Sequence, residues 1–212
     1  MPRSLIESLL SVLFPERCVG CARLGALFCE GCRASLEPYA AQRPLQHLEL
    51  DGINIGFVFE GPLREAIHQF KYQRRHRMAK PLGRLLAAQA SPSFAANAII
   101  VPVPLHAARQ RERGFNQAEI LAEEVARALM LPVLREGLVR QRATEQQAHL
   151  DARQRRENVR GAFVWQGTAA PPKRVLLLDD VITTGATIGA CAEALRRAGA
   201  REVYALALAR SR

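Results

Sequence analysis

Short apolar runs alternate with helical segments along the chain from residue 53 onward. Each run has the length of a buried strand, and each helical segment repeats its apolar residues at helical spacing. Strands that alternate with helices are typical of a mainly parallel sheet. The sequence therefore predicts an α/β protein with strands near 53–59, 98–101, 161–165, 175–178 and 202–208 and helices near 62–72, 78–89, 114–129 and 188–198.

The segment 175–187 carries the strongest functional pattern. Four apolar residues suit a strand buried on both faces, and Asp179 and Asp180 follow where this strand would leave its sheet. A turn rich in threonine and glycine then precedes a helix, whose first N–H groups and dipole can hold a phosphate. The carboxylates can accept hydrogen bonds from vicinal hydroxyls or hold Mg²⁺ through water. The pattern predicts a ribose 5-phosphate site, with an ordinary strand–turn–helix as the alternative.

A second polar segment follows the strand that begins near residue 98. Pro102 and Pro104 cannot continue a central strand, so they place a loop at its carboxyl end, where α/β sheets bind ligands. Arg109, Arg111 and Arg113 come next and precede a helix. Planar guanidinium groups suit bidentate binding of phosphate. The arginines are therefore candidates for holding two phosphates, and a merely basic helix entry is the alternative.

The segment 141–160 breaks the apolar pattern and predicts no buried element. Long polar segments inside compact domains are either disordered or functional lids. Its basic and amide side chains could close over a polyanion. These residues are Arg142, Thr144, Gln146, Arg153, Arg156 and Asn158.

Two Cys-x-x-Cys knuckles lie within fifteen residues near the N-terminus, at Cys18, Cys21, Cys29 and Cys32. A glycine in each knuckle permits the tight turn that directs two sulfurs to one centre. Four thiolates can close a tetrahedral Zn²⁺ site, which has no open position and is therefore structural. Disulfides are the alternative, and a reducing compartment disfavours them. The fifth cysteine, Cys191, lies at helical spacing from Ile188 and Leu195 and is expected to be a buried apolar residue.

Composition and charge narrow the classes of protein and partner. The 212 residues suit one ordinary domain with a small module, and an apolar content of 49% is that of a globular protein. A formal charge of +10 favours nucleic acid or pyrophosphate as partners. The apolar run 5–14 is too short for a membrane span and lacks a cleavage site for a signal peptide, so it predicts an amphipathic helix and a cytoplasmic protein.

The motif Asp179-Asp180 followed by Thr-Thr-Gly-x-Thr resembles the signature with which type I phosphoribosyltransferases bind 5-phosphoribosyl-1-pyrophosphate (PRPP). This resemblance extends to the ComF family, including GntX-like proteins, over essentially the whole chain. The motifs that carry it are the cysteine module, Val101-Pro-Val-Pro-Leu-His106, Arg113-Gly-Phe-Asn-Gln117 and the stretch Gln146…Arg153…Asn158…Gly161-Ala-Phe163. The resemblance implies a type I phosphoribosyltransferase fold at 53–212. It also implies a helix and zinc module at 1–37 and a connector at 38–52.

The resemblance further implies roles for individual residues. Asp179 and Asp180 would bind the ribose and act in catalysis, and Mg²⁺ would accompany PRPP. The 5-phosphate loop would comprise Val181, Thr183, Thr184, Gly185, Ala186 and Thr187. The pyrophosphate loop would comprise Val103, Pro104, Leu105 and His106, with Arg109, Arg113 and Arg142 as clamps.

Two functions remain open from the sequence. The first is transfer of phosphoribosyl from PRPP to an unidentified nitrogen acceptor, because no base pocket is recognisable. The second is a non-catalytic protein on the same fold that binds single-stranded DNA or the competence machinery. The resemblance links both to DNA uptake and natural transformation, and the chain shows no run of aromatic residues interleaved with basic ones.

Overall fold

A central sheet of four parallel strands organises the protein. We describe it from a computed structural model that covers residues 16–40, 49–73, 75–142 and 152–211. The strands are β1 (Gly52–Val58), β2 (Ile99–Pro102), β5 (Arg174–Ile182) and β6 (Glu202–Arg210), in the order β1-β6-β5-β2. All three pairings are parallel. The prediction of an α/β protein with a mainly parallel sheet is confirmed.

Alternate residues of the strands pack into two separate hydrophobic cores, one on each face of the sheet. Leu176 and Leu178 of β5 belong to one core, whereas Val175 and Leu177 belong to the other. Because side chains alternate across a strand, a continuous apolar run is what two covered faces require. The second core also contains Cys191, which is fully buried as expected.

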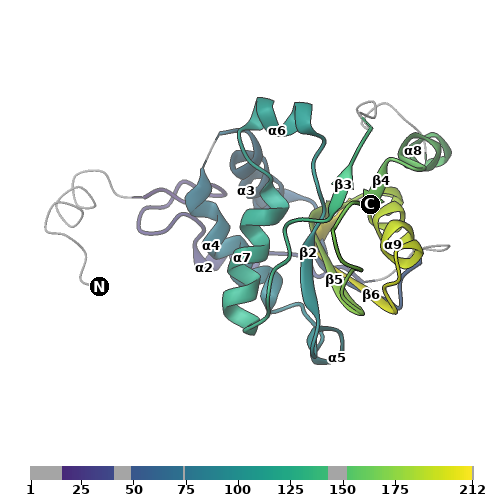
Figure 1. The fold of residues 1–212 in the computed structure, drawn as a ribbon. Helices are drawn as coiled ribbons and strands as arrows, with labels where there is room; N and C mark the ends of the chain where they lie inside the picture. Colours follow the sequence, from purple (N-terminus) through teal and green to yellow (C-terminus); the bar gives the residue numbers. More distant parts are fainter. Residues whose placement is uncertain (1–15, 41–48, 74, 143–151, 212) are drawn as a thin grey trace, which may run out of the picture.

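Helices cover both faces of the sheet (Figure 1). The first face is covered by α3 (Gly61–Tyr72), the 3₁₀ turn η1 (His76–Met78), α4 (Ala79–Ala87) and α7 (Gln117–Leu129). The second face is covered by α9 (Ala186–Arg197), together with α8 (Ala152–Val159) and an antiparallel pair formed by β3 (Leu138–Arg140) and β4 (Phe163–Trp165). Short helices α5 (Pro92–Ala95) and α6 (Ala107–Arg113) flank β2 along the chain.

The four-cysteine segment packs against α3 and shares its core. It contains the helix α2 (Glu30–Ala34). Phe28 and Leu36 are buried in the same core as Leu63 and Phe70 of α3. A Cβ at Gly20 would lie 2.8 Å from Cβ of Pro62, so the backbone there approaches α3 closely. The module is therefore continuous with the main domain rather than tethered to it.

Two expectations about local structure were wrong. The strand β5 does not end at residue 178 but continues to Ile182, because Asp179 and Val181 pair with β6. Asp179 and Asp180 consequently lie within the strand. The polar segment 141–160 does contain a buried element, since α8 ends at Val159 and that side chain lies in the second core.

Some predicted features lie outside the described residues. These are the helix at 5–14, most of the connector at 38–52, and positions 143–151 with Thr144 and Gln146. Among the described helices, none combines the length and apolar character needed to cross a bilayer.

Candidate functional site

The loop after β5 leads directly into the N-terminus of α9. Gly185 is the N-cap residue of this helix and has φ +82°, a left-handed conformation that costs a residue with a side chain about 1–2 kcal/mol. It has no side chain to accept hydrogen bonds from the first turn, although the N–H of Ala186 donates weakly to Oγ1 of Thr184 at 3.4 Å. The backbone donors of the first helical turn are therefore the natural anion-binding groups of this loop.

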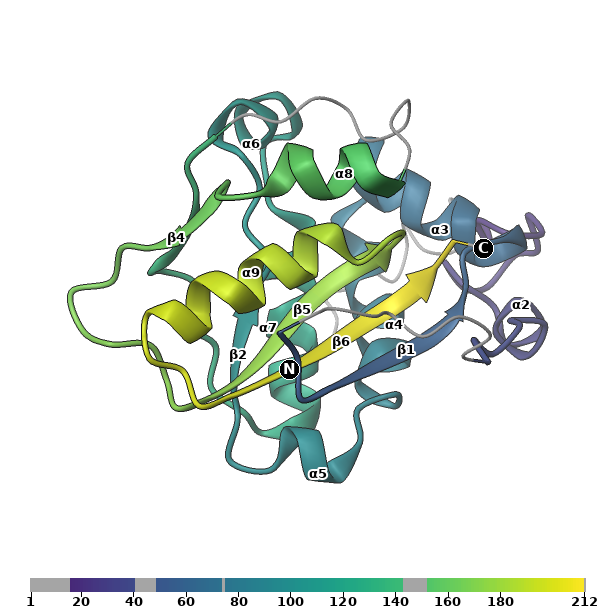
Figure 2. The same cartoon turned by 90° about the vertical axis from the view of Figure 1, so that its right-hand side faces the viewer.

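The loop is supported from β6. Arg210 donates through Nε to the carbonyl of Thr183 at 3.2 Å and through Nη1 to the hydroxyl of Tyr39 at 2.7 Å. Thr183, Thr184 and Thr187 remain partly exposed. The carboxyl ends of β5, β6 and β1 point to the same side of the molecule (Figure 2), so this loop lies at the edge where parallel sheets bind ligands.

The two aspartates face opposite sides of the sheet. Asp180 occupies a position on the same face of the sheet as Leu176 and Leu178 and is 2% exposed. Its Oδ2 lies 2.5 Å from Nζ of Lys71, at the end of α3. Asp179 follows the parity of Val175 and Leu177 and is partly exposed. Successive strand positions start their side chains on opposite faces, but the charge and side chain of Asp180 still act on Asp179, so the two carboxyl groups remain close.

Asp179 lies in an environment that opposes its ionisation. Burial, and secondarily the charge of Asp180, raise the pKa of the Asp179 carboxyl well above its ordinary value, while Lys71 acts in the opposite direction. Its Oδ1 accepts a hydrogen bond from the backbone N–H of Asp180 at 2.8 Å. Carboxyl groups with strongly raised pKa values are common in functional sites, and this one lies at an edge where parallel sheets bind ligands.

Two cations near the aspartates were missed by the sequence analysis. Lys71 comes four residues after buried Ile67, so helical spacing alone could have placed it on the inner face of α3. Arg140 is 8% exposed, and its guanidinium lies 5.4 Å from the centre of the Phe163 ring. Burial, and then repulsion from Arg109, lower the pKa of Arg140, whereas Asp179 raises it. Its strand β3 has three residues, too few to give a periodic signal.

The predicted pyrophosphate loop lies beside the end of β5. The N–H of Val103 donates to the carbonyl of Leu178 at 2.9 Å, and Nδ2 of Asn116 donates to the carbonyl of Val103 at 3.1 Å. Pro104, Leu105 and His106 follow and are partly exposed. His106 caps α6, since its Nδ1 accepts from the N–H of Ala108 at 3.3 Å.

The candidate arginine clamps differ in their surroundings. Arg109 is partly exposed and close enough to Arg140 to affect its pKa. Arg113 donates to Gln117 and lies over the ring of Tyr72. Arg142 donates to the carbonyls of Asn158 at 3.0 Å and Arg160 at 2.9 Å. Arg142 therefore caps the C-terminal end of α8.

The four predicted metal ligands converge. The sulfurs of Cys18, Cys21, Cys29 and Cys32 all lie within 4.8 Å of one another, with Cys18 and Cys32 3.6 Å apart and Cys21 and Cys29 3.5 Å apart. A tetrahedral site with Zn–S bonds of about 2.3 Å places its sulfurs about 3.8 Å apart, so the arrangement fits. None of the four forms a disulfide.

Backbone groups favour the thiolate form of Cys18, whereas burial and hydrogen bonds with the other three cysteines raise the pKa of Cys32. Although burial acts in the opposite direction, hydrogen bonds from backbone N–H groups, first that of Cys29 at 3.3 Å, lower the pKa of Cys18 to about 6. Metal ligation requires the deprotonated thiol. A Cβ at Gly20 would lie 2.9 Å from Sγ of Cys32, so glycine leaves room for the sulfur. The cluster can therefore hold a metal ion.

The chain resembles several known bacterial proteins. It is 34% identical over 208 residues to Competence protein F of Haemophilus influenzae, covering 92% of this chain and 90% of that protein. It is 36% identical over 155 residues to the DNA utilization protein YhgH of Escherichia coli K12, covering 71% and 68%. It is 33% identical over 114 residues to Competence protein ComFC of Bacillus subtilis, covering 53% and 45%.

Two further comparisons add little. No protein-family model matches the chain. A crystal structure of TT1426 from Thermus thermophilus aligns with a TM-score of 0.36 and 18% identity, covering 61% of this chain and 83% of that one. A similarity at this level supports no conclusion about the site.

Proposed function

The chain belongs to the ComF family of competence and DNA-utilization proteins, and from this premise we propose that the loop 183–187 binds the 5-phosphate of PRPP. The observation that carries the proposal is the left-handed Gly185 at the start of α9, an N-cap residue without a side chain to accept from the first turn, beside a partly exposed Asp179. Donors for a phosphate and an acceptor for hydroxyls therefore lie at one strand end. That combination suits a ribose 5-phosphate.

In this proposal Asp179 contacts the ribose hydroxyls directly. Asp180 reaches the ligand only if Lys71 leaves its carboxylate, and a phosphate oxygen of PRPP is a suitable new partner for the ammonium group. Residues 103–106 then face the pyrophosphate, with Arg109 and Arg113 as the nearest clamps. Arg142 can join them only by releasing the carbonyls at the end of α8.

The proposed reaction is displacement of pyrophosphate from C1 of the ribose by a nitrogen nucleophile. Positive charge develops on the sugar in an oxocarbenium-like transition state, and the carboxylate of Asp179 stabilises it. The arginines stabilise the negative charge of the departing pyrophosphate. Mg²⁺, which PRPP carries when bound, supplies further positive charge to that leaving group. Pyrophosphate release across a panel of nucleobases tests for turnover.

We further propose that the cysteine cluster holds Zn²⁺ in a structural role. The four sulfurs have the spacing of a closed tetrahedral site, and Cys18 and Cys32 are buried. Such a site leaves no position for a substrate. Its contribution is to fix the segment that packs on α3.

The second candidate function is binding of single-stranded DNA by the same fold. Its support is the net charge of +10 and the relatives' names, which refer to competence and DNA utilization. If phosphates dominate binding, the logarithm of affinity falls with the logarithm of salt concentration by about 0.7 per contacted phosphate. An affinity that does not change with salt would count against this function.

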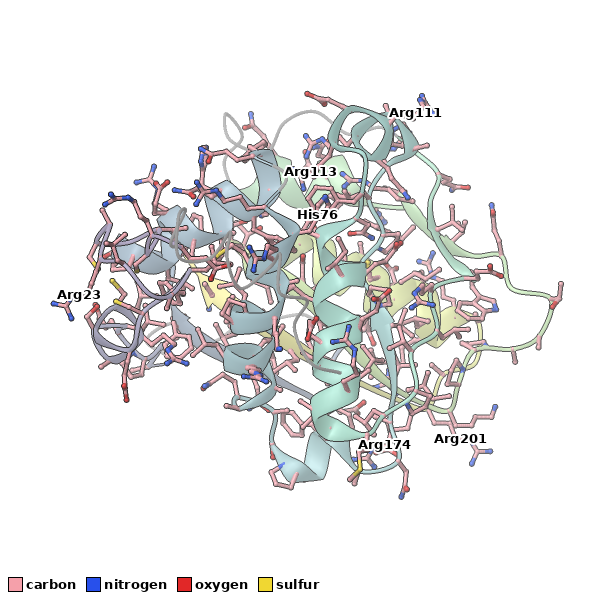
Figure 3. The ribbon with its side chains drawn as sticks, turned by 90° about the vertical axis from the view of Figure 1, so that its left-hand side faces the viewer. Arg23, His76, Arg111, Arg113, Arg174 and Arg201 are labelled. Carbon is pink, nitrogen blue, oxygen red and sulfur yellow. The ribbon has the colours of Figure 1, made fainter. Side chains whose placement is uncertain are left out.

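Calorimetric titration with PRPP and Mg²⁺ tests the proposed function. We expect the wild-type protein to bind and Asp179→Asn to bind at least about tenfold more weakly, since losing a charge-assisted hydrogen bond removes about 1.5–3 kcal/mol. Arg201→Ala is the matched control. Arg201 is an exposed charge far from Arg113 (Figure 3), and its variant should bind normally.

Unfolding would not explain a loss of binding in Asp179→Asn. The pKa of Asp179 is raised in the folded state, so its ionisation lowers stability as pH rises from the unfolded value of about 4 through the folded value. Asparagine removes that penalty at neutral pH and keeps the oxygen that accepts from Asp180. A variant that is equally or more stable and binds PRPP like the wild type would refute the role of Asp179.

A further inference from the structure

An exposed aromatic ring ends α3 next to the residue that contacts the acidic strand. Tyr72 is 63% exposed, and its neighbour Lys71 contacts Asp180. A single exposed apolar side chain is normal on a surface, so the significance of this ring depends on the charged and aromatic groups around it. Nothing proposed above for PRPP or the metal uses this ring.

Two side chains hold the Tyr72 ring in place. The guanidinium of Arg113 lies 5.1 Å from the ring centre, within the range of a cation–π interaction. The ring of His68, one helical turn earlier, lies 5.0 Å away at 46°. Arg113 is in turn hydrogen bonded to Gln117, at the first position of α7. The ring is thus oriented by both α3 and the α6–α7 junction.

Further aromatic contacts tie this junction to the core. Phe115 lies between α6 and α7, and its ring centre is 5.8 Å from that of buried Phe70 and 4.5 Å from that of exposed His76. The Phe115 contacts position the junction firmly against α3. Arg113 and His76 lie close together on one face in Figure 3. Tyr72 and His76, both exposed, therefore share a surface with Arg113.

This surface adjoins the proposed phosphate-binding edge. Arg113 ends α6, whose N-cap residue is His106, the last residue of the predicted pyrophosphate loop. On the other side, Lys71, the neighbour of Tyr72, connects this surface to Asp180 through its ion pair. Arg75 and Arg111 are exposed near the two chain segments that form it. Planar rings beside cations recognise a flat, π-rich group attached to a phosphate.

We propose that Tyr72, with Arg113, forms a stacking subsite for an unpaired nucleobase. Every base has a π-face, so an aromatic platform accepts bases with little regard to sequence, and an arginine adds a cation–π contribution. The ligand is either a free base, as the acceptor of the phosphoribosyl group, or a base within a single strand. The link to phosphoribosyl transfer rests on the proposed function; the stacking itself does not.

Binding of three probes tests the subsite. They are a fluorescent single-stranded deoxyoligonucleotide, an oligonucleotide of the same length made of abasic nucleotides, and a panel of free nucleobases. The variants are Tyr72→Ala and Tyr72→Phe, with Arg201→Ala as the distant control. Because Tyr72 is largely exposed, these variants are expected to keep the wild-type melting temperature.

We expect Tyr72→Ala to weaken binding of the base-bearing probe about tenfold and Tyr72→Phe to change it less than about twofold. Wild-type protein should prefer the normal oligonucleotide to the abasic one, and Tyr72→Ala should lose that preference. If Tyr72→Ala weakens binding of the free bases alone, the ligand of the subsite is the acceptor base. If it weakens binding of the oligonucleotide, the ligand is a base within a single strand.

Equal binding of normal and abasic strands by the wild type, without binding of free bases, would overturn the subsite. So would wild-type affinity in Tyr72→Ala. PRPP affinity without a base should be unchanged in both Tyr72 variants. If the wild type binds bases through Tyr72 but never binds PRPP, the subsite stands and the proposed transferase function fails.

Discussion

Replacing Lys71 with methionine is expected to destabilise the folded protein by about 3 kcal/mol. Asp180 is 2% exposed, and Lys71 is its ion-pair partner at 2.5 Å. Removing one member of a buried pair leaves the other charge uncompensated, at a cost of about 3–5 kcal/mol. Lys71 itself is 19% exposed, so water can partly replace its ammonium and the lower end of the range applies. Urea unfolding monitored by circular dichroism measures the change.

Two controls separate charge from packing at this position. Lys71→Arg keeps the positive charge and should lose much less stability than Lys71→Met. The double variant Lys71→Met/Asp180→Asn removes both charges and should recover most of the loss, because no unpaired ion remains. A single Lys71→Met variant with the wild-type unfolding midpoint would show that the ion pair contributes nothing to the fold.

Removing metal from the cysteine cluster is expected to unfold residues 16–37. Only Cys18, Phe28, Cys32 and Leu36 of this segment are buried, and metal binding in comparable zinc peptides supplies about 10–16 kcal/mol. Phe28 and Leu36 share a core with Leu63 of α3, so the loss should also lower the melting temperature of the main domain. Hydrogen exchange of the chelated protein locates the unfolded amides, and added Zn²⁺ should restore their protection.

The remaining cysteine offers a matched control for this experiment. The wild-type protein should contain one metal ion per chain. Cys32→Ser should lose this ion, whereas Cys191→Ala should keep it, because Cys191 is buried in the opposite core. Purified protein that contains no metal and melts at the same temperature with and without chelator would contradict a structural metal.

The sequence predicted those features that depend on neighbouring residues. Apolar runs such as 175–178 identified strands buried on both faces, and the paired Cys-x-x-Cys spacing identified a cluster whose sulfurs do converge. The family resemblance of the motifs is confirmed by relatives matched over most of the chain. The apolar run and each Cys-x-x-Cys knuckle are patterns of a few neighbouring residues, so the local geometry of the chain restricts the structures that they can form.

Features that depend on tertiary pairing could not be predicted. The extension of β5 through Asp180 is set by its pairing with β6, and this extension turns the two aspartates to opposite faces. Lys71 and Arg140 meet the acidic strand only through folding, from segments far away in the sequence. The helix α8 forms in a polar segment because Val159 docks in the second core.

The central claim is that the loop between β5 and α9 binds a sugar phosphate, and a crystal structure with PRPP and Mg²⁺ tests it most directly. The account predicts the 5-phosphate on the backbone N–H groups of residues 184–187 and the ribose hydroxyls on Asp179. A phosphate bound only to Arg109 and Arg113, with the loop left without ligand at saturating PRPP, would contradict it.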